Sequence, residues 1–418
     1  MFGGGGDKAL SMPLMETLRQ AWADEELRRK LLFVLMMFSV FALGINVPVP
    51  IPGISSAELT KSVADIPFFQ LLDVFGGGAL RRLSIFALGL NPYITASIIM
   101  QILTQAYPAW KQELKEGGEY ARKQQNKRTR LFTLVLCVFQ SLGLLGMLNN
   151  ALPPEAQTML VKATVIIFWT AGAMFVLWLG EQISEKGIGN GVSLMIFAGI
   201  ILSLPNQVKQ VLTQYNEGFA QWWQVGLLGL LFLGTTWLIV LFTIAQRRVP
   251  IQHMRRVVGT KMLGGQTSYL PLSVVMAGVI PLIFAVSLIF IPQQFASMFP
   301  PDAPMHGFLM GLSEWLSPMS KFPKGLVASI IYTALIFFFT YFYTAIQFNV
   351  DDISDNLKRG GSFIPGVRPG KQTRDFLDGV ISRITVAGAG FLAFVALIQY
   401  VAWSLTKIQS VSTIVLHF

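Results

Sequence analysis

The chain has 418 residues, of which 53% are hydrophobic and only 13% charged, and its mean hydropathy is +0.56. These values exclude an ordinary soluble globular protein and indicate a membrane protein with several spans. The formal net charge of +10 means that basic residues outnumber acidic ones. Cys137 is the single cysteine, so disulfide bonds within the chain and a cysteine metal cluster are both excluded.

Nine apolar runs along the chain are interpreted as membrane spans. A hydrocarbon core about 30 Å thick needs roughly 20 apolar residues per helix. In chain order, the predicted spans cover approximately residues 31–47, 83–107, 131–149, 160–180, 191–204, 222–245, 270–292, 325–348 and 380–403. The first run follows a charged amphipathic stretch and no small-residue cleavage site stands after it. We therefore interpret it as an uncleaved span and not as a signal peptide.

The segment before the second span is poorly suited to a helix, because three glycines occupy positions 76–78. Each costs roughly 1 kcal/mol relative to alanine, and irregular backbone is tolerated at membrane depth only inside protein or beside water. We expect residues 68–80 to enter the membrane as a short half-helix and turn, with the span starting near Leu83. Pro92 and Pro281 are expected to bend spans two and seven. Ordinary proline kinks and a packing loop explain these features too.

Most of the 32 lysine and arginine residues fall on one side of the predicted membrane, in the N-terminal tail and the loops after even-numbered spans. The positive-inside rule therefore predicts a cytoplasmic N-terminus. The loops at about 246–269 and 349–379 carry clustered bases together with Gly and Pro. They are interpreted as docking surfaces for an acidic partner, protein or RNA phosphate, although plain solvated loops fit the composition equally well.

The predicted spans contain no internal acidic residue and no histidine. Carriers coupled to ions usually place such groups at membrane depth, and intramembrane proteases need catalytic ones. An enzyme is therefore not expected. A bound nucleotide is not expected either, because GVRPGKQT (residues 366–373) lacks the spacing and the Ser or Thr of a phosphate loop. What remains is a passive pathway lined by Ile, Val and Leu, which excludes water and ions by dewetting.

Five stretches carry the most specific pattern in the sequence. They are GLNPYITASIIMQ (89–101), GEQISEKGIGNGVSLMIFAGI (180–200), QRRVPIQHMRRVVG (246–259), LPLSVVMAGVIPLIFA (270–285) and DNLKRGGSFIPGVRPGKQT (355–373). In order and spacing they closely resemble the SecY/Sec61-alpha family, the channel subunits of the Sec translocon. The resemblance covers essentially the whole chain. It implies an all-α polytopic fold of two pseudo-symmetric five-helix halves, here residues 1–205 and 206–418, and a channel that moves unfolded polypeptides.

The resemblance also implies roles for particular residues. The plug, a half-helix that seals the channel at about residues 68–80, would include Phe68, Leu71, Leu72, Phe75, Gly76, Gly77 and Gly78. The constriction ring would map onto Leu90, Ile94, Val192, Ile196 and Ile283. A lateral gate toward lipid would include Thr95, Gln101 and Pro281. Satisfied hydrogen bonds between helices explain the two polar gate residues equally well.

The partners implied by the resemblance are the SecA motor ATPase, the translating ribosome, the small membrane subunits SecE and SecG, signal sequences with their nascent polypeptides, and the lipid bilayer. Docking of SecA or the ribosome would use Arg247, Arg248, Arg255, Arg256, Arg368 and Lys371. Arg368 is the strongest candidate for coupling to the motor. The implied location is the bacterial cytoplasmic membrane, and no cofactor is expected.

Two departures from the family pattern concern the loop at 115–130, where Ala121 stands in place of a usual glycine, and the end of the sequence. The residues after Trp403 are too few for the family's tenth span, which we expect to be missing from this sequence. The alternative function is a secondary transporter of a small solute with broken helices. A membrane scaffold without a pore is a third, weaker interpretation.

Overall fold

In the computed structural model, the chain forms two compact units, Met1–Asn206 and Gln207–Phe418. The boundary falls inside helix α9 (Gly191–Asn216). The structure describes residues 14–50, 73, 76–148, 158–218, 220–253, 256–258, 261–263, 267–296, 299, 303–318, 320 and 323–406. Each unit has its own buried hydrophobic core.

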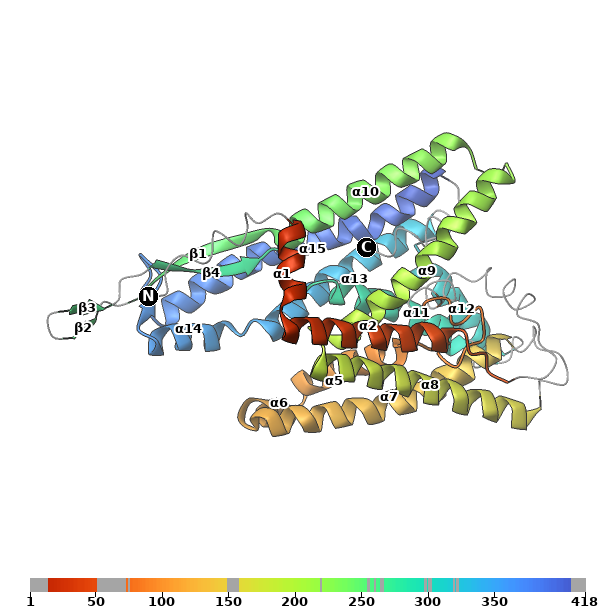
Figure 1. Cartoon of the computed structure of the whole chain (residues 1–418), viewed down its shortest axis with the longest axis horizontal. Helices are drawn as coiled ribbons and strands as arrows, with labels where there is room; N and C mark the ends of the chain where they lie inside the picture. The colour runs from red at the N-terminus through yellow and green to blue at the C-terminus, as the bar shows by residue number, and fades with distance from the viewer. Residues whose placement is uncertain are drawn as a thin grey trace. The chain divides into compact units, whose positions relative to one another are not determined.

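Helices make up the described part of the N-terminal unit (Figure 1). They are α1 (Leu14–Ala23), α2 (Glu25–Ile45), α5 (Asn91–Ala106), α6 (Pro108–Glu116), α7 (Gly118–Leu148), α8 (Met159–Lys186) and the first part of α9. Asp24 separates α1 from α2 because its carboxylate caps α2, accepting hydrogen bonds from the backbone N–H groups of Glu26 (2.9 Å) and Leu27 (3.3 Å). Helix α7 packs against α5 and α8, and α8 packs against α2.

The C-terminal unit contains α10 (Trp222–Ile244), α11 (Ile280–Ala296), α12 (Pro304–Leu316), α13 (Lys324–Gln347), α14 (Val350–Arg359) and α15 (Lys371–Thr406). Helix α13 packs against both α11 and α15, and α15 also contacts α10 and α14. Most of the long apolar runs expected from the sequence thus become helices, which satisfy the backbone polar groups of their interior within one segment. The mostly helical, polytopic fold predicted from the sequence is confirmed.

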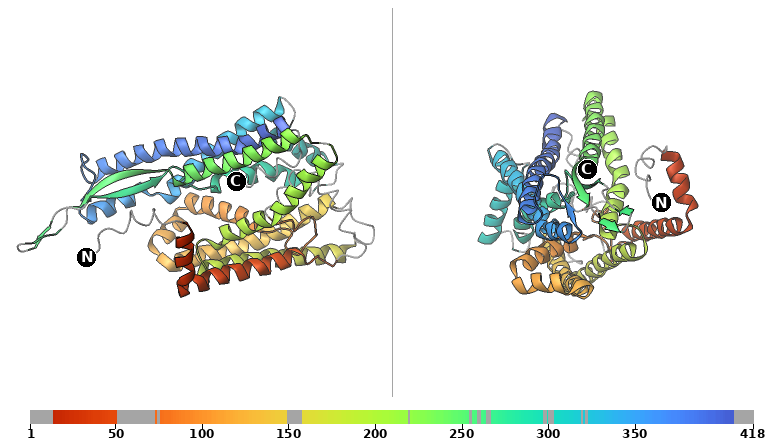
Figure 2. Two further views of the ribbon diagram at one scale, coloured as in Figure 1. Left: turned by 45° about the horizontal axis from the view of Figure 1, so that its top comes forward. Right: turned by 90° about the vertical axis from the view of Figure 1, so that its left-hand side faces the viewer.

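A small β-structure stands where the sequence predicted only a basic loop. Strand β1 (Gln246–His253) follows α10 directly and pairs antiparallel with β4 (Thr267–Ser273), with Val249 opposite Leu270. The short strand β5 (Ser362–Phe363) pairs with the other edge of β1, so the strand order is β4-β1-β5. A separate two-stranded hairpin, β2 (Arg256–Val258) and β3 (Lys261–Leu263), lies beyond the end of the β1–β4 pair (Figure 2).

Six helical stretches among the described residues are long and apolar enough to cross a membrane by length and composition. The predicted spans at 31–47, 83–107 and 270–292 correspond instead to α2, α5 and α11. Helices α5 and α11 have only 16 and 17 residues. They are short because residues 83–90 are not helical, residues 270–273 belong to β4 and residues 274–279 form turns, although the sequence analysis placed these stretches inside spans.

Pro92 and Pro281 do not bend their spans, and this prediction was wrong. Each proline lies in the first turn of its helix, α5 or α11. The first turn has backbone N–H groups without helical partners, so a residue that lacks this group and fixes φ near −65° is favoured there. The prolines inside helices are Pro205 in α9 and Pro292 in α11.

Gly172 lets α8 approach the irregular segment before α5 closely. A β-carbon at this position would collide with the backbone carbonyl of Ile85 and lie 3.3 Å from Phe86 Cδ1. We expect Gly172→Ala to destabilise the protein by about 1–3 kcal/mol, because backbone atoms cannot move aside as a flexible side chain can. Thermal unfolding of the purified protein in detergent would measure the change.

Gly229 in α10 provides the matched control, because a β-carbon there meets no atom within 4 Å. Gly229→Ala is expected to leave the midpoint temperature of thermal unfolding unchanged or to raise it, since alanine stabilises a helix by about 1 kcal/mol relative to glycine. A midpoint for Gly172→Ala at or above that of Gly229→Ala would contradict the tight packing of α8.

Candidate functional site

Four of the five candidate ring residues lie together in the N-terminal unit. Leu90 caps the N-terminus of α5 and is 6% exposed, and Ile94 lies one turn further along. Val192 and Ile196 occupy the first turns of α9. All four belong to or pack against one hydrophobic cluster, in which Ile94, Val192 and Ile196 are only partly buried. Branched apolar side chains therefore remain accessible at the helix beginnings inside this unit.

The beginning of α9 is held in place by polar contacts. The Asn190 side chain accepts a hydrogen bond from the Ser193 backbone N–H at 3.2 Å, and the Gly191 N–H donates to Ser184 Oγ at 2.8 Å. A β-carbon on Gly191 would collide with the carbonyl of Gly180, so only glycine allows α9 to begin so close to α8. These contacts fix where Val192 and Ile196 stand. The fifth candidate, Ile283, is partly buried on α11 of the C-terminal unit.

The glycines of the predicted plug lie in buried, irregular backbone. Gly77 and Gly78 have φ values of 70° and 85°, which L-residues with side chains rarely adopt. A β-carbon on Gly77 would lie 2.7 Å from Ile45 Cδ1 and 3.4 Å from the Gly199 carbonyl oxygen. Glycine is therefore needed for both conformation and space. The candidate plug residues outside the described part of the chain are Phe68, Leu71, Leu72 and Phe75.

A buried ion pair beside these glycines was missed by the sequence reasoning. Asp73 and Arg81 flank the glycine turn, with 2.5 Å between Asp73 Oδ2 and Arg81 Nε. The sequence does carry a signal, because an acidic and a basic residue stand on either side of three glycines. Asp73 and Arg81 both precede the predicted second span, so the lack of internal acidic residues in the spans did not reveal the pair.

The candidate lateral-gate residues bond within their own helix and not between helices. Thr95 Oγ1 donates to the Asn91 carbonyl at 3.0 Å. Gln101 Nε2 donates to Ser97 Oγ at 3.2 Å, while its Oε1 is buried and has no hydrogen-bond partner among the described residues. The interhelical hydrogen bonds offered as their alternative explanation are therefore not found for these two side chains in the described structure. Pro281 is buried at the start of α11.

Tertiary structure joins the two basic loops into one surface, which we call the basic sheet. It consists of β1, β4 and β5 with the loop at 364–370 and the start of α15. Val249 of β1, Ile364 of the loop and Leu377 of α15 share one hydrophobic cluster beneath it. The docking candidates Arg247, Arg248, Arg368 and Lys371 are all exposed. Arg256 belongs to β2 by its backbone, and Arg255 lies outside the described residues.

The loop that carries Arg368 is rigidly held. Gly366 and Gly370 have φ values of 82° and 101°. Thr373 Oγ1 donates to the Arg368 carbonyl at 2.9 Å, and Ser354 Oγ donates to the Gly370 carbonyl at 3.1 Å. The backbone of this loop is thus fixed from both α14 and α15, while the guanidinium remains in solvent.

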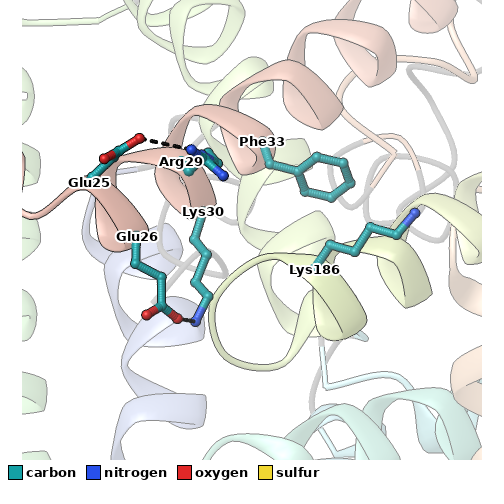
Figure 3. A pocket seen from close by; sticks show the side chains of 6 residues that line it. All are labelled: Glu25, Glu26, Arg29, Lys30, Phe33 and Lys186. Atoms are coloured by element: carbon teal, nitrogen blue, oxygen red, sulfur yellow. Dashed lines mark hydrogen bonds and ion pairs between the residues drawn. The ribbon is translucent and has the colours of Figure 1, made fainter.

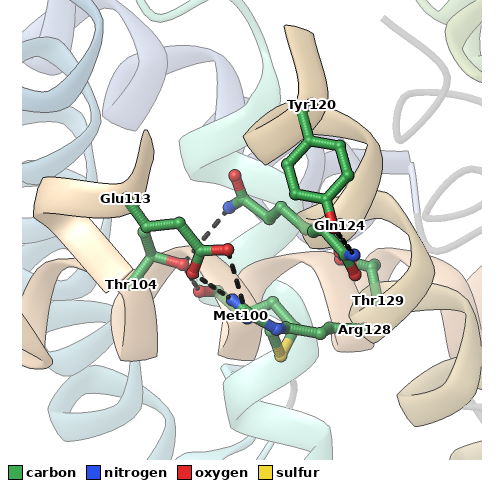
Figure 4. A network of polar contacts seen from close by, with 8 residues as sticks. Met100, Thr104, Glu113, Tyr120, Gln124, Arg128 and Thr129 are labelled. Carbon is green, nitrogen blue, oxygen red and sulfur yellow. Dashed lines mark hydrogen bonds and ion pairs between the residues drawn. The ribbon is translucent and has the colours of Figure 1, made fainter. Parts of the chain in front are cut away.

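The region at 115–130, where Ala121 departs from the family pattern, is ordered as the end of α6 and the beginning of α7 (Figure 4). Arg128 of α7 contacts both carboxylate oxygens of Glu113 at 3.0 and 3.4 Å and lies 4.8 Å over the Trp110 ring. Gln125 Nε2 of α7 donates to Thr104 Oγ1 of α5 at 3.2 Å. The contacts tie α5, α6 and α7 into one corner.

An open pocket lies between the N-terminal end of α2 and the C-terminal end of α8 (Figure 3). Its charged groups are largely paired, with 2.8 Å between Arg29 and Glu25 and 2.6 Å between Lys30 and Glu26. Both pairs are exposed, so each contributes little to stability. Within the described ranges, no group of three or more His, Cys, Asp or Glu side chains is placed to hold a metal ion.

These features define a class, namely a multi-pass helical membrane protein. One unit has partly buried apolar side chains near the N-terminal ends of α5 and α9, and the other unit has the exposed basic sheet. The SecY family model matches residues 84–416. The chain belongs to the SecY family. Protein translocase subunit SecY of Escherichia coli (strain K12) is 40% identical over 383 residues, which cover 89% of this chain and 84% of that protein.

Further relatives and solved structures agree. SecY of Vibrio cholerae is 40% identical over 390 residues, covering 91% of this chain and 86% of that protein. A structure described as a protein conducting channel superimposes with a TM-score of 0.62 at 20% identity, covering 93% of this chain and 89% of the other. Sec61 in the canine ribosome–channel complex superimposes with a TM-score of 0.60 at 18% identity and the same coverage. At these identities the structural likeness establishes the fold.

Proposed function

We propose that this chain is a protein-conducting channel, which translocates unfolded secretory polypeptides across the bacterial cytoplasmic membrane and releases transmembrane segments into it. The observation that carries the proposal is that Leu90 belongs to one hydrophobic cluster, against which the partly buried Ile94, Val192 and Ile196 also pack. Branched apolar side chains form a gasket that fits a passing chain without binding it tightly. When nothing passes, the same side chains exclude water and ions.

In this proposal Ile283 completes the ring from the second half of the chain, and residues 68–80 serve as the plug. Thr95, Gln101 and Pro281 border the lateral gate. The unpartnered Oε1 of Gln101 supports a place at an opening helix contact, because separation of the helices would let water satisfy it.

The channel carries out no covalent chemistry in this proposal, and its energy comes from partners. The basic sheet would dock the SecA motor or the translating ribosome, because exposed arginines suit both acidic protein surfaces and RNA phosphate. In this proposal the sheet and the N-terminus would lie on the cytoplasmic side. SecE and SecG would complete the membrane complex.

A photocrosslinking residue at Ile196 tests the central claim. With SecE and SecG present and a secretory precursor stalled during SecA-driven transport, we expect Ile196 to crosslink to the precursor. Phe197 is the matched control, since it is the next residue on α9 and is exposed on the outside of its unit. The crosslink at Ile196 should need both ATP and the signal sequence, and Phe197 should give little or none.

Two outcomes would count against the proposal. Equal labelling at Ile196 and Phe197 would show that the precursor does not pass through the candidate ring. Absence of any transported precursor, together with flux of a small solute in the same vesicles, would favour the secondary transporter.

A further inference from the structure

The Asp73–Arg81 ion pair is the most deeply buried pair of opposite charges among the described residues. The Asp73 side chain is 4% exposed and that of Arg81 is 21% exposed. Besides the ion pair, Asp73 Oδ1 accepts a hydrogen bond from the Arg81 backbone N–H at 3.0 Å. The Asp73 carbonyl also accepts one from the Gly78 N–H at 2.6 Å. These contacts join Asp73 to the turn at residues 76–81.

This turn lies close to the candidate ring residues of α5 and α9. A β-carbon on Gly89, the neighbour of Leu90, would lie 3.5 Å from Gly76 Cα, so Gly76 packs directly beside the start of α5. Gly77 packs against Gly199, one turn along α9 from Ile196. The turn therefore fills space next to two of the candidate ring residues.

Arg81 is attached to a fixed part of the unit. The Val49 N–H donates to the Leu83 carbonyl at 2.8 Å, and the Ile85 N–H donates to the Val47 carbonyl at 3.1 Å. Ser84 Oγ donates to the Gly44 carbonyl at 2.8 Å. The residues after Arg81 are thus bonded to the end of α2 and the segment that follows it. Arg81 can hold Asp73 in place without itself moving.

We propose that Asp73 and Arg81 are positioning residues that keep the glycine turn seated beside the ring and so hold the channel shut. The inference rests on the proposed function and adds to it which charges maintain the closed state. A buried ion pair costs about as much in desolvation as it gains in attraction, but removal of one partner leaves a buried charge unpaired. The closed state should therefore tolerate the loss of both charges far better than the loss of one.

The test uses the full chain, reconstituted with SecE and SecG in planar lipid bilayers, and measures ion conductance without a precursor. Arg81→Gln is expected to raise the resting conductance about tenfold or more, because Asp73 is left buried without a counter-charge. Asp73→Asn should raise it less, since the partly exposed Arg81 can reach water. The double variant Asp73→Asn/Arg81→Gln should return close to wild type.

Arg130→Gln is the matched control, because it also breaks an arginine–carboxylate pair, 2.6 Å from Glu181, but a more exposed one. It should leave the resting conductance unchanged. Equal conductance for wild type and Arg81→Gln would overturn the inference, and so would a double variant as leaky as Arg81→Gln. If Arg81→Gln does not assemble, the inference requires the double variant to assemble and to show the wild-type resting conductance. A double variant that does not assemble, or that leaks, would overturn the inference.

Translocation of a normal precursor by the wild-type complex, measured in parallel, separates this inference from the proposed function. Failure of the wild-type complex to move any precursor counts against the channel itself. Normal transport combined with an unaltered resting conductance in Arg81→Gln counts only against the ion pair. A merely structural role would lower the amount of assembled protein in Arg81→Gln and leave the resting conductance per assembled channel at the wild-type value.

Discussion

Replacement of Arg368 by Glu is expected to reduce SecA-driven translocation by about 30-fold or more. The side chain is exposed, while its backbone is held by Gly366, Gly370 and the Thr373 hydroxyl. The variant should therefore fold normally, and the loss should come from the partner contact. Arginine contacts at the centre of an interface typically contribute about 2–4 kcal/mol, and a reversed charge adds repulsion. The initial rate of ATP-dependent precursor import into vesicles measures the effect.

Arg359 is the control for this prediction, since it is an exposed arginine at the end of α14 and outside the loop at 364–370. Arg359→Glu should keep most of the transport rate. Equal rates for the two variants would mean that the loop makes no special contact with the motor. Binding of SecA to the vesicles should fall in parallel with transport for Arg368→Glu, and its salt dependence should weaken because one ionic contact is lost.

Simultaneous replacement of Ile94, Val192 and Ile196 by Ser should make the resting channel permeable to ions. Each substitution removes branched apolar surface from a constriction that excludes water by dewetting. A free-energy change of about 1.4 kcal/mol already corresponds to a tenfold change in an equilibrium constant. Full burial of one such side chain contributes about 1.5–3 kcal/mol. We expect the ion conductance of reconstituted bilayers to rise at least about tenfold above that of wild type.

A triple control uses apolar residues of the same two helices that face away from the cluster. Ile102, Phe197 and Ile201 are exposed on α5 and α9. Their replacement by Ser should change membrane insertion more than conductance, because these side chains face outward from their unit. If both triple variants leak equally, the ring would be assigned to the wrong residues and the leak to general loosening of the helices.

The two predictions concern separate steps and can fail separately. Loss of Arg368 should block driven transport and leave the resting barrier intact. Polar ring residues should open the barrier and leave SecA binding intact. A variant set in which both effects always appear together would indicate a damaged fold and not two functional sites.

The sequence alone predicted the helical class, because apolar runs in a bilayer must become helices whose backbone groups are satisfied internally. It also located the irregular segment at Gly76–Gly78, since consecutive glycines disfavour a helix wherever they occur. It could not decide what Pro92 and Pro281 do. A proline can kink a helix or begin one, and the choice depends on whether the preceding residues have somewhere else to pack.

The candidate ring came from the motif pattern, and no local property separates Ile94 or Ile196 from ordinary core residues. Only the fold of the N-terminal unit brings them to one hydrophobic cluster. The basic loops show the same limit. Their charge was evident in the sequence, but the pairing of β1 with β5 joins residues more than one hundred positions apart, as in Gln252 opposite Phe363. Such long-range pairing is set by the packing of whole elements and not by local propensity.

Composition and hydrophobic runs thus determined the class and the approximate positions of most apolar helices, and charge asymmetry predicted surfaces for partners, because each of these follows from local free energies of burial and solvation. The tertiary structure decided which of those residues meet. It alone placed Asp73 against Arg81 and seated their turn beside Leu90, because a buried charge is stable only where the fold supplies its counter-charge.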